Sequence, residues 1–266
     1  MTGPHRNLTW EIMTSTERFD ILGSEVTMPV QIRAARCFVA GYTADAQAVR
    51  RAIAARGDVP LQPLEVRSGR AVCMLVFVEY LDGDLGPYHE FGVCFLIDDP
   101  AAPAASRLSA LRSLGRGDAH ALIHQLPVDG EFTLAAGRGI WGFPKIMADF
   151  EVDHDSAVKH GRVSADGRMI ADLTVRPGIP MPSSASEAVL QSYSQLDGVT
   201  RRTPWRLEST SGTRTRLGGA ALRLGTHPIA DQLRALGLSR RALTSSSVAD
   251  LAMTFDPAVV LDPDSA

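Results

Sequence analysis

Lysine is scarce in this chain of 266 residues, because only two of its 27 basic residues are lysines and the others are arginines. This avoidance of lysine is typical of a high-GC coding bias, and it draws attention to each lysine that remains. Lys159 lies in the polar segment 153–161, where we expect a solvated charge. Lys145 lies in the apolar segment 140–148, where a cation is expensive to bury.

Long apolar runs are also missing. No run reaches the roughly eighteen residues needed to cross a bilayer, and residues 1–14 are polar and lack the apolar core of a secretion signal. The net charge of −3 gives no sign of general nucleic-acid binding. We therefore expect a cytoplasmic protein with neither a membrane nor a nucleic acid as its partner.

Cysteine is the third scarce residue. Cys37, Cys73 and Cys94 lie in apolar, strand-like segments, and none is spaced as C-x-x-C. An odd number of such cysteines argues against a disulfide framework. We expect all three to be small residues of the core.

Several familiar catalytic motifs are absent. The chain has no G-x-S-x-G elbow and no G-x-x-x-x-G-K phosphate loop, and the G-x-G at residues 137–139 lacks a third glycine. His120 and His124 are four residues apart but have no third spaced ligand, so we expect structural histidines. The sequence therefore predicts no metal site and no cofactor.

The apolar patterns predict mainly strands. With 45% apolar residues, the chain can form a substantial core. Strands are expected at 33–42, 71–80, 88–97, 119–128, 147–152, 161–163, 169–175, 214–224 and 247–255, and helices at 45–55 and 229–236. Asp166-Gly167 predicts a hairpin turn, and 98–105 and 177–186 read as loops. Because the strands do not alternate with regular helices, we predict a β-rich α+β fold. We expect an irregular arm at 1–25 and a single domain at 26–266.

Residues 137–145, Gly-Arg-Gly-Ile-Trp-Gly-Phe-Pro-Lys, contain the strongest candidate for chemistry. Pro144 fixes its own φ and restricts the residue before it. Desolvation disfavours the ammonium form of a lysine and lowers its pKa, and a neutral amine attacks ketones. Neighbouring apolar side chains can supply the dry wall: Trp141, Phe143, Ile146 and Met147. Alternatively, the stem of Lys145 packs on Trp141 while its amine reaches solvent.

This segment resembles the active-site signature of the acetoacetate decarboxylase superfamily, in which the lysine after Phe/Tyr-Pro forms a Schiff base. Lys145 occupies that position. Tyr88-His89-Glu90 resembles the family's Tyr-x-Glu segment, whose glutamate faces the lysine. Segments 227–233 and 244–247 resemble the family's C-terminal motifs, so the similarity extends from about Val26 to Val260. The resemblance implies an antiparallel barrel or cone-like core and a homo-oligomer.

The chain also departs from the family pattern. Ile146 replaces a second lysine that typically follows the first, and Gly139 replaces a glutamate. The family's N-terminal active-site arginine has two candidates, Arg33 and Arg36. These changes leave the approach to Lys145 more apolar and roomier, which favours a bulkier substrate and chemistry such as aldol condensation and dehydration.

The expected function is therefore that of a lyase that forms a Schiff base with a keto acid or ketone, by decarboxylation or by aldol-dehydration chemistry. Lys145 and Glu90 are the expected catalytic residues. The alternative is a non-catalytic small-molecule-binding protein that retains the pocket. The expected substrate-binding residues are Arg33, Arg36 and Arg138 for a carboxylate, together with Tyr88, Trp141 and Phe143.

Overall fold

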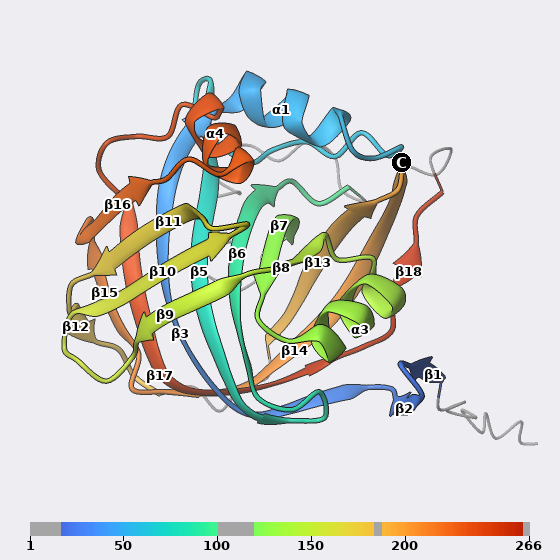
Figure 1. Cartoon of the computed structure of the whole chain (residues 1–266). Coiled ribbons are helices and arrows are strands. Elements are labelled where there is room, and N and C mark those ends of the chain that lie inside the picture. Colours follow the sequence, from blue (N-terminus) through green and yellow to red (C-terminus); the bar gives the residue numbers. More distant parts are fainter. Residues whose placement is uncertain (1–16, 101–119, 184–187, 263–266) are drawn as a thin grey trace, which may run out of the picture.

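The computed structural model describes residues 17–100, 120–183 and 188–262. Its centre is a barrel closed by seven strands (Figure 1). In spatial order these are β17 (Thr244–Phe255), β3 (Val30–Asp45), β5 (Arg70–Gly83), β6 (Tyr88–Ile97), β7 (His120–Val128), β13 (Ala188–Leu196) and β14 (Val199–Ser211), which pairs again with β17. All neighbours in the barrel are antiparallel except β7 and β13, which run parallel. The predicted β-rich α+β fold with an antiparallel barrel is confirmed, with that one parallel pair.

A second sheet covers part of the outer face of the barrel (Figure 1). Its strand order is β16 (Ala220–Leu224), β11 (Arg168–Val175), β10 (Lys159–Ala165) and β9 (Asp149–Asp153). Short strands extend the barrel sheet at its margins: β4 (Glu65–Arg67), β8 (Lys145–Met147), β12 (Ile179–Pro180), β15 (Arg214–Leu217) and β18 (Val259–Val260).

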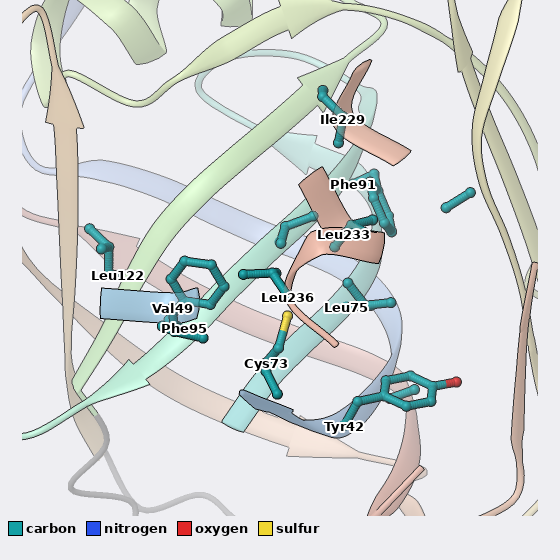
Figure 2. Close-up of a cluster of buried hydrophobic side chains, with 14 of the residues drawn as sticks. Tyr42, Val49, Cys73, Leu75, Phe91, Phe95, Leu122, Ile229, Leu233 and Leu236 are labelled. Atoms are coloured by element: carbon teal, nitrogen blue, oxygen red, sulfur yellow. The ribbon is translucent and has the colours of Figure 1, made fainter. Parts of the chain in front are cut away.

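Two helices close one end of this outer layer. In α1 (Ala46–Ala54), the carboxylate of Asp45 caps the helix by accepting from the N–H of Ala48. In α4 (Pro228–Ala235), His227 caps the helix and proline stands in its first turn. Figure 2 shows side chains of α4, Ile229 and Leu233, beside barrel side chains such as Leu75 and Phe91. The main hydrophobic core therefore lies outside the barrel wall.

Turns with positive φ decide two of the predicted elements, one correctly predicted and one not. Asp166 and Gly167 both have positive φ and join β10 to β11, which confirms the predicted hairpin. The single strand predicted at 214–224 is wrong. Gly218 and Gly219 both have positive φ, and they divide the segment between β15 and β16, which belong to different sheets.

The N-terminal arm is also more regular than expected. β1 (Arg18–Ile21) and β2 (Ser24–Thr27) form a hairpin, whereas residues 1–16 of the predicted arm lie outside the described residues. Parts of both predicted loops, 101–105 and 184–186, likewise lie outside them. Among the described residues, no helix is long and apolar enough to span a membrane.

Candidate active site

The barrel interior contains a cavity of about 300 Å³. Its wall takes side chains from every barrel strand, because alternate residues of a strand point to opposite faces. On β3, for example, Cys37 faces the cavity while the neighbouring Phe38 packs in the outer core. The interior of the barrel is thus left partly empty, although the outer face is closely packed.

Helix α3 (Glu131–Trp141) delivers the lysine to this cavity. Gly142 ends the helix in the left-handed conformation, with φ of 62°, and the N–H of Phe143 donates to the carbonyl of Gly137 at 2.9 Å. Pro144 then prevents the helix from continuing. The next residue, Lys145, begins β8, which pairs with β7 through Leu126. The Gly-Phe-Pro-Lys sequence is therefore a helix stop that turns the lysine toward the barrel.

Gly137 makes room for the lysine side chain on the helix. A Cβ at this position would lie 2.5 Å from Cδ and 2.6 Å from Cε of Lys145. Any side chain at residue 137 would therefore displace the stem of the lysine.

The amine of Lys145 is buried and makes two polar contacts. The side chain is 3% exposed, and its Nζ lies 3.0 Å from Oε2 of Glu90. The same Nζ donates to Oγ1 of Thr133 at 2.8 Å. The alternative reading, in which the amine reaches solvent, does not fit this burial. Glu90 is also buried, so it is not the exposed carboxylate that the start of a strand could offer.

Two stacked tyrosines complete the polar part of the site. Tyr80 donates to Oε1 of Glu90 at 3.0 Å, and its ring stacks on Tyr88 with centroids 4.2 Å apart. Nζ of Lys145 lies 5.0 Å from the centroid of the Tyr88 ring. Burial, followed by the negative charge of Glu90, raises the pKa of both tyrosines well above the usual value. Both phenols therefore stay protonated, and Tyr80 remains a hydrogen-bond donor to Glu90.

The predicted aromatic residues also line the cavity. Trp141 and Phe143 are buried and stacked, with centroids 5.7 Å apart. The indole N–H of Trp141 donates to the carbonyl of Asp256 at 2.9 Å, which fixes the ring. The structure thus brings together Lys145, Glu90, Tyr88, Trp141 and Phe143 around one cavity.

The three predicted arginines are not brought to the cavity. Arg33 is exposed and paired with Asp82 and Asp84. Arg36 pairs with two carboxylates outside the barrel, those of Glu79 and Asp155. Arg138 donates to the carbonyl of Lys145 at 3.2 Å, so it holds the turn that carries the lysine. The expectation that one of these arginines binds a substrate carboxylate has no support in this geometry.

Other expectations about the lysine segment also need correction. Ile146 packs toward the outer core and Met147 is 43% exposed, so neither forms part of the cavity wall. Strand β8 points both side chains away from the cavity. Lys159 is half-buried, and its Nζ donates to the carbonyl of His154 at 2.6 Å, so it is not a freely solvated charge.

The two histidines of β7 have separate surroundings. Nδ1 of His120 lies 3.0 Å from the hydroxyl of Tyr193, and the ring of His124 stacks on Phe95. Among the described residues, no group of three or more His, Cys, Asp or Glu side chains could hold a metal ion.

Sequence reasoning missed Thr133, Tyr80 and the role of Gly137. Tyr80 had a usable signal, because the predicted strands 71–80 and 88–97 are joined by a short turn and place Tyr80 opposite Tyr88. Thr133 could not be placed in the site, because helix α3, which carries it, was not predicted.

The family model described as acetoacetate decarboxylase (ADC) matches residues 22–263. No curated protein matches the chain in sequence. Among solved structures, acetoacetate decarboxylase from Legionella pneumophila has a TM-score of 0.61 and 19% identity, over 88% of this chain and 87% of that one. Another acetoacetate decarboxylase structure has a TM-score of 0.60 and 18% identity, over 88% and 89%.

A third similar structure is the enduracididine biosynthesis enzyme MppR complexed with pyruvate. Its TM-score is 0.60 at 14% identity, over 89% of this chain and 91% of that one. At such identities these likenesses show a shared fold.

Proposed function

Because the chain belongs to the acetoacetate decarboxylase family, we propose that it is a lyase that forms a Schiff base between Lys145 and a carbonyl substrate. One observation carries the proposal: the buried amine of Lys145 faces an apolar cavity and contacts the carboxylate of Glu90. Such a pair can hold and pass a proton where a ketone or aldehyde would react.

The first step is transfer of a proton from the ammonium of Lys145 to Glu90, across 3.0 Å. The neutral amine then adds to the carbonyl carbon, and the carbonyl oxygen leaves as water after it has taken up one proton from the added amine and one from Glu90. Thr133, which accepts a hydrogen bond from Nζ, orients the amine during this addition. The product is a protonated imine, whose positive charge Glu90 offsets.

The protonated imine accepts the electron pair of a bond broken at the adjacent carbon. Loss of CO₂ and loss of a proton both use this sink, and an enamine formed in either way can attack an aldehyde. The structural neighbours are consistent with both outcomes, since they include acetoacetate decarboxylase and MppR with the condensation product of pyruvate and imidazole 4-carboxaldehyde. We further propose a cytoplasmic homo-oligomer, as the family resemblance implies.

Borohydride trapping tests the proposal. The protein is incubated with pyruvate, acetoacetate or a simple ketone and reduced, and its tryptic peptides are then weighed. We expect the added mass on the peptide that contains Lys145. The variant Lys145→Ala should lose the adduct, and the matched variant Lys159→Ala should keep it.

Two results would contradict the proposal. An adduct on Lys159 would show nonspecific chemistry. Tight binding of a carbonyl compound without any trapped adduct would favour the alternative, a non-catalytic binding protein that retains the pocket.

A further inference from the structure

The wall of the Lys145 cavity is made mainly of hydrocarbon. Aliphatic and aromatic side chains dominate it, among them Val30, Ile32, Leu126, Leu251, Met253 and Phe255. Of the hydroxyl side chains in the wall, Tyr80 already donates to Glu90 and Ser192 donates to the carbonyl of Thr203. A ligand beyond its reacting carbonyl therefore meets mostly apolar surface.

The ionisable groups of the wall sum to one cation and one anion. Lys145 and Glu90 contact each other, and the two tyrosines stay neutral. Burial raises the pKa of the Cys37 and Cys94 thiols to about 12, so these are neutral as well. Among the described residues that line the cavity there is no arginine.

A substrate carboxylate would therefore be a second anion in the cavity. The charge of Lys145, before or after imine formation, is already offset by Glu90. An unpaired ion in an apolar interior is strongly disfavoured. Arg201 is not one of the residues that line the cavity, but it lies on the same face of β14 as the lining residue Trp205. Its side chain lies against Gly142, and its Nη1 is buried without a hydrogen-bond partner among the described residues. Arg201 is therefore the cation nearest to hand that could balance a substrate carboxylate.

The size of the cavity points to a substrate longer than acetoacetate. A volume of about 300 Å³ corresponds to roughly ten water-sized groups, at about 30 Å³ each. A methyl ketone with a hydrocarbon tail would fill it. Each methylene moved from water into such a wall improves binding about fourfold.

From this wall, its charge balance and its volume, we propose that the carbonyl substrate of Lys145 is uncharged: a ketone or aldehyde with a hydrocarbon tail rather than a keto acid. This inference rests on the proposed function and specifies its substrate class. Without a carboxylate the reaction is not a decarboxylation. The imine of a neutral ketone instead loses an α proton to Glu90, which gives an enamine and a protonated carboxyl group. The enamine then attacks an aldehyde or, when none is bound, takes back a solvent-derived proton, which exchanges the α hydrogen.

The decisive comparison uses pentan-2-one and 4-oxopentanoate. These two methyl ketones share the same five-carbon chain, but the second has a carboxylate in place of the terminal methyl group. We expect borohydride to trap pentan-2-one on Lys145 at least a hundredfold more efficiently. From propanone to octan-2-one, trapping at low ketone concentration should rise about fourfold per methylene until the cavity is full.

A cavity-filling variant tests whether the tail lies where we place it. Gly92 lines the cavity, and a Cβ there would meet Cys94, Leu126 and Val76 at ordinary distances of 3.4, 3.7 and 3.8 Å. Gly92→Leu should reduce trapping of octan-2-one at least fivefold more than it reduces trapping of propanone. Gly92→Ala, the matched control, should change both much less.

The outcomes separate the two proposals. If no carbonyl compound is trapped on Lys145, the proposed function fails. If 4-oxopentanoate is trapped as well as pentan-2-one, the proposed function stands and the inference about substrate class is overturned. In that case loss of 4-oxopentanoate trapping in Arg201→Leu would identify Arg201 as the carboxylate ligand.

Discussion

Glu90 contacts both the amine of Lys145 and the hydroxyl of Tyr80, through different carboxylate oxygens. Tyr80 thus holds one oxygen by donating to it, while the other remains free to exchange a proton with the lysine or the substrate. In the proposed mechanism, Glu90 therefore exchanges a proton with Lys145, and Tyr80 orients the carboxylate.

The first prediction is that Glu90→Gln separates imine formation from turnover. Glutamine keeps the shape of the side chain but cannot accept a proton. The adduct on Lys145 should still form, although more slowly because the ammonium loses its proton acceptor, whereas turnover should fall by roughly 10²-fold or more, the usual scale of general acid–base catalysis. Exchange of α hydrogen into deuterated water, followed by mass spectrometry, measures the effect. Turnover equal to that of the unmodified protein would return Glu90 to a structural role.

The second prediction compares two glycines of α3. Gly137→Ala should displace the Lys145 stem, because the new Cβ would lie 2.5 Å from Cδ. Gly139→Ala should be tolerated, because its Cβ would meet only Ile21, at 3.6 Å. Alanine also favours a helix over glycine by about 1 kcal/mol.

Gly139→Ala should therefore melt at or above the temperature of the unmodified protein and keep trapping, whereas Gly137→Ala should lose trapping at least tenfold. Trapping and thermal unfolding are measured on the same samples. Equal trapping in the two variants would show that the lysine does not need the space at residue 137.

At the residue scale, the expectation that Glu90 faces Lys145 is confirmed, whereas the catalytic roles of both residues stay predictions. Lys145 and Glu90 were recognisable from short motifs, and the structure places them 3.0 Å apart. The arginines could not be located in this way, because a side chain on a strand changes face with a shift of one residue. Register shifts in β3 near Ala34 and Ala35 make such a count along the strand unreliable for Arg33 and Arg36.

At the scale of elements, helix α3 shows why part of the site was missed. Its sequence contains two glycines, Gly137 and Gly139, which lower helix propensity. The stop signal was nevertheless present in Gly142 and Pro144. Similarly, Asp197 and Gly198 have positive φ and join β13 to β14. The same Asp-Gly signal had correctly predicted the turn at 166–167, so this hairpin could have been predicted.

The third prediction concerns the packing of β7 against helices α1 and α4. His124 of β7 is buried beside α1 and α4, and burial, followed by the charge of Arg56, lowers its pKa to about 3. A hydrogen bond with Gln232 of α4 opposes this shift. In the unfolded chain the pKa returns to about 6.5, so the unfolded state binds the additional proton as the pH falls. Stability is therefore lost progressively from about pH 6.5 downward.

Between about pH 6.5 and 4.5, this one group should cost about 2–3 kcal/mol. Urea unfolding at the two pH values measures the loss, and His124→Gln should reduce it by a comparable amount, whatever its effect on stability at neutral pH. An unchanged loss in the variant would show that other groups cause the acid sensitivity of the fold.

At the scale of the whole molecule, the main core and the candidate site lie on opposite faces of the barrel wall. The outer face packs against the second sheet and the helices in one large core. The inner face leaves a cavity of about 300 Å³ and contains a buried ion pair. Empty volume and buried charge both lower stability. The outer core offsets that cost, so the fold can retain a hollow centre suited to binding and chemistry.

The fourth prediction follows from this division of roles. Removing one member of a buried ion pair leaves the other uncompensated, so Lys145→Met and Glu90→Gln should each destabilise the protein, by about 3 kcal/mol where the remaining group stays charged. Replacing both leaves no buried charge, and the methionine side chain would fill nearly the same volume as the lysine stem. Lys145→Met/Glu90→Gln should therefore be at least as stable as the unmodified protein while forming no adduct.

Urea unfolding of the unmodified protein, the two single variants and the double variant measures the coupling between the two residues. A double variant less stable than either single variant would mean that the ion pair supports the fold, and it would weaken the case that these charges are retained for chemistry.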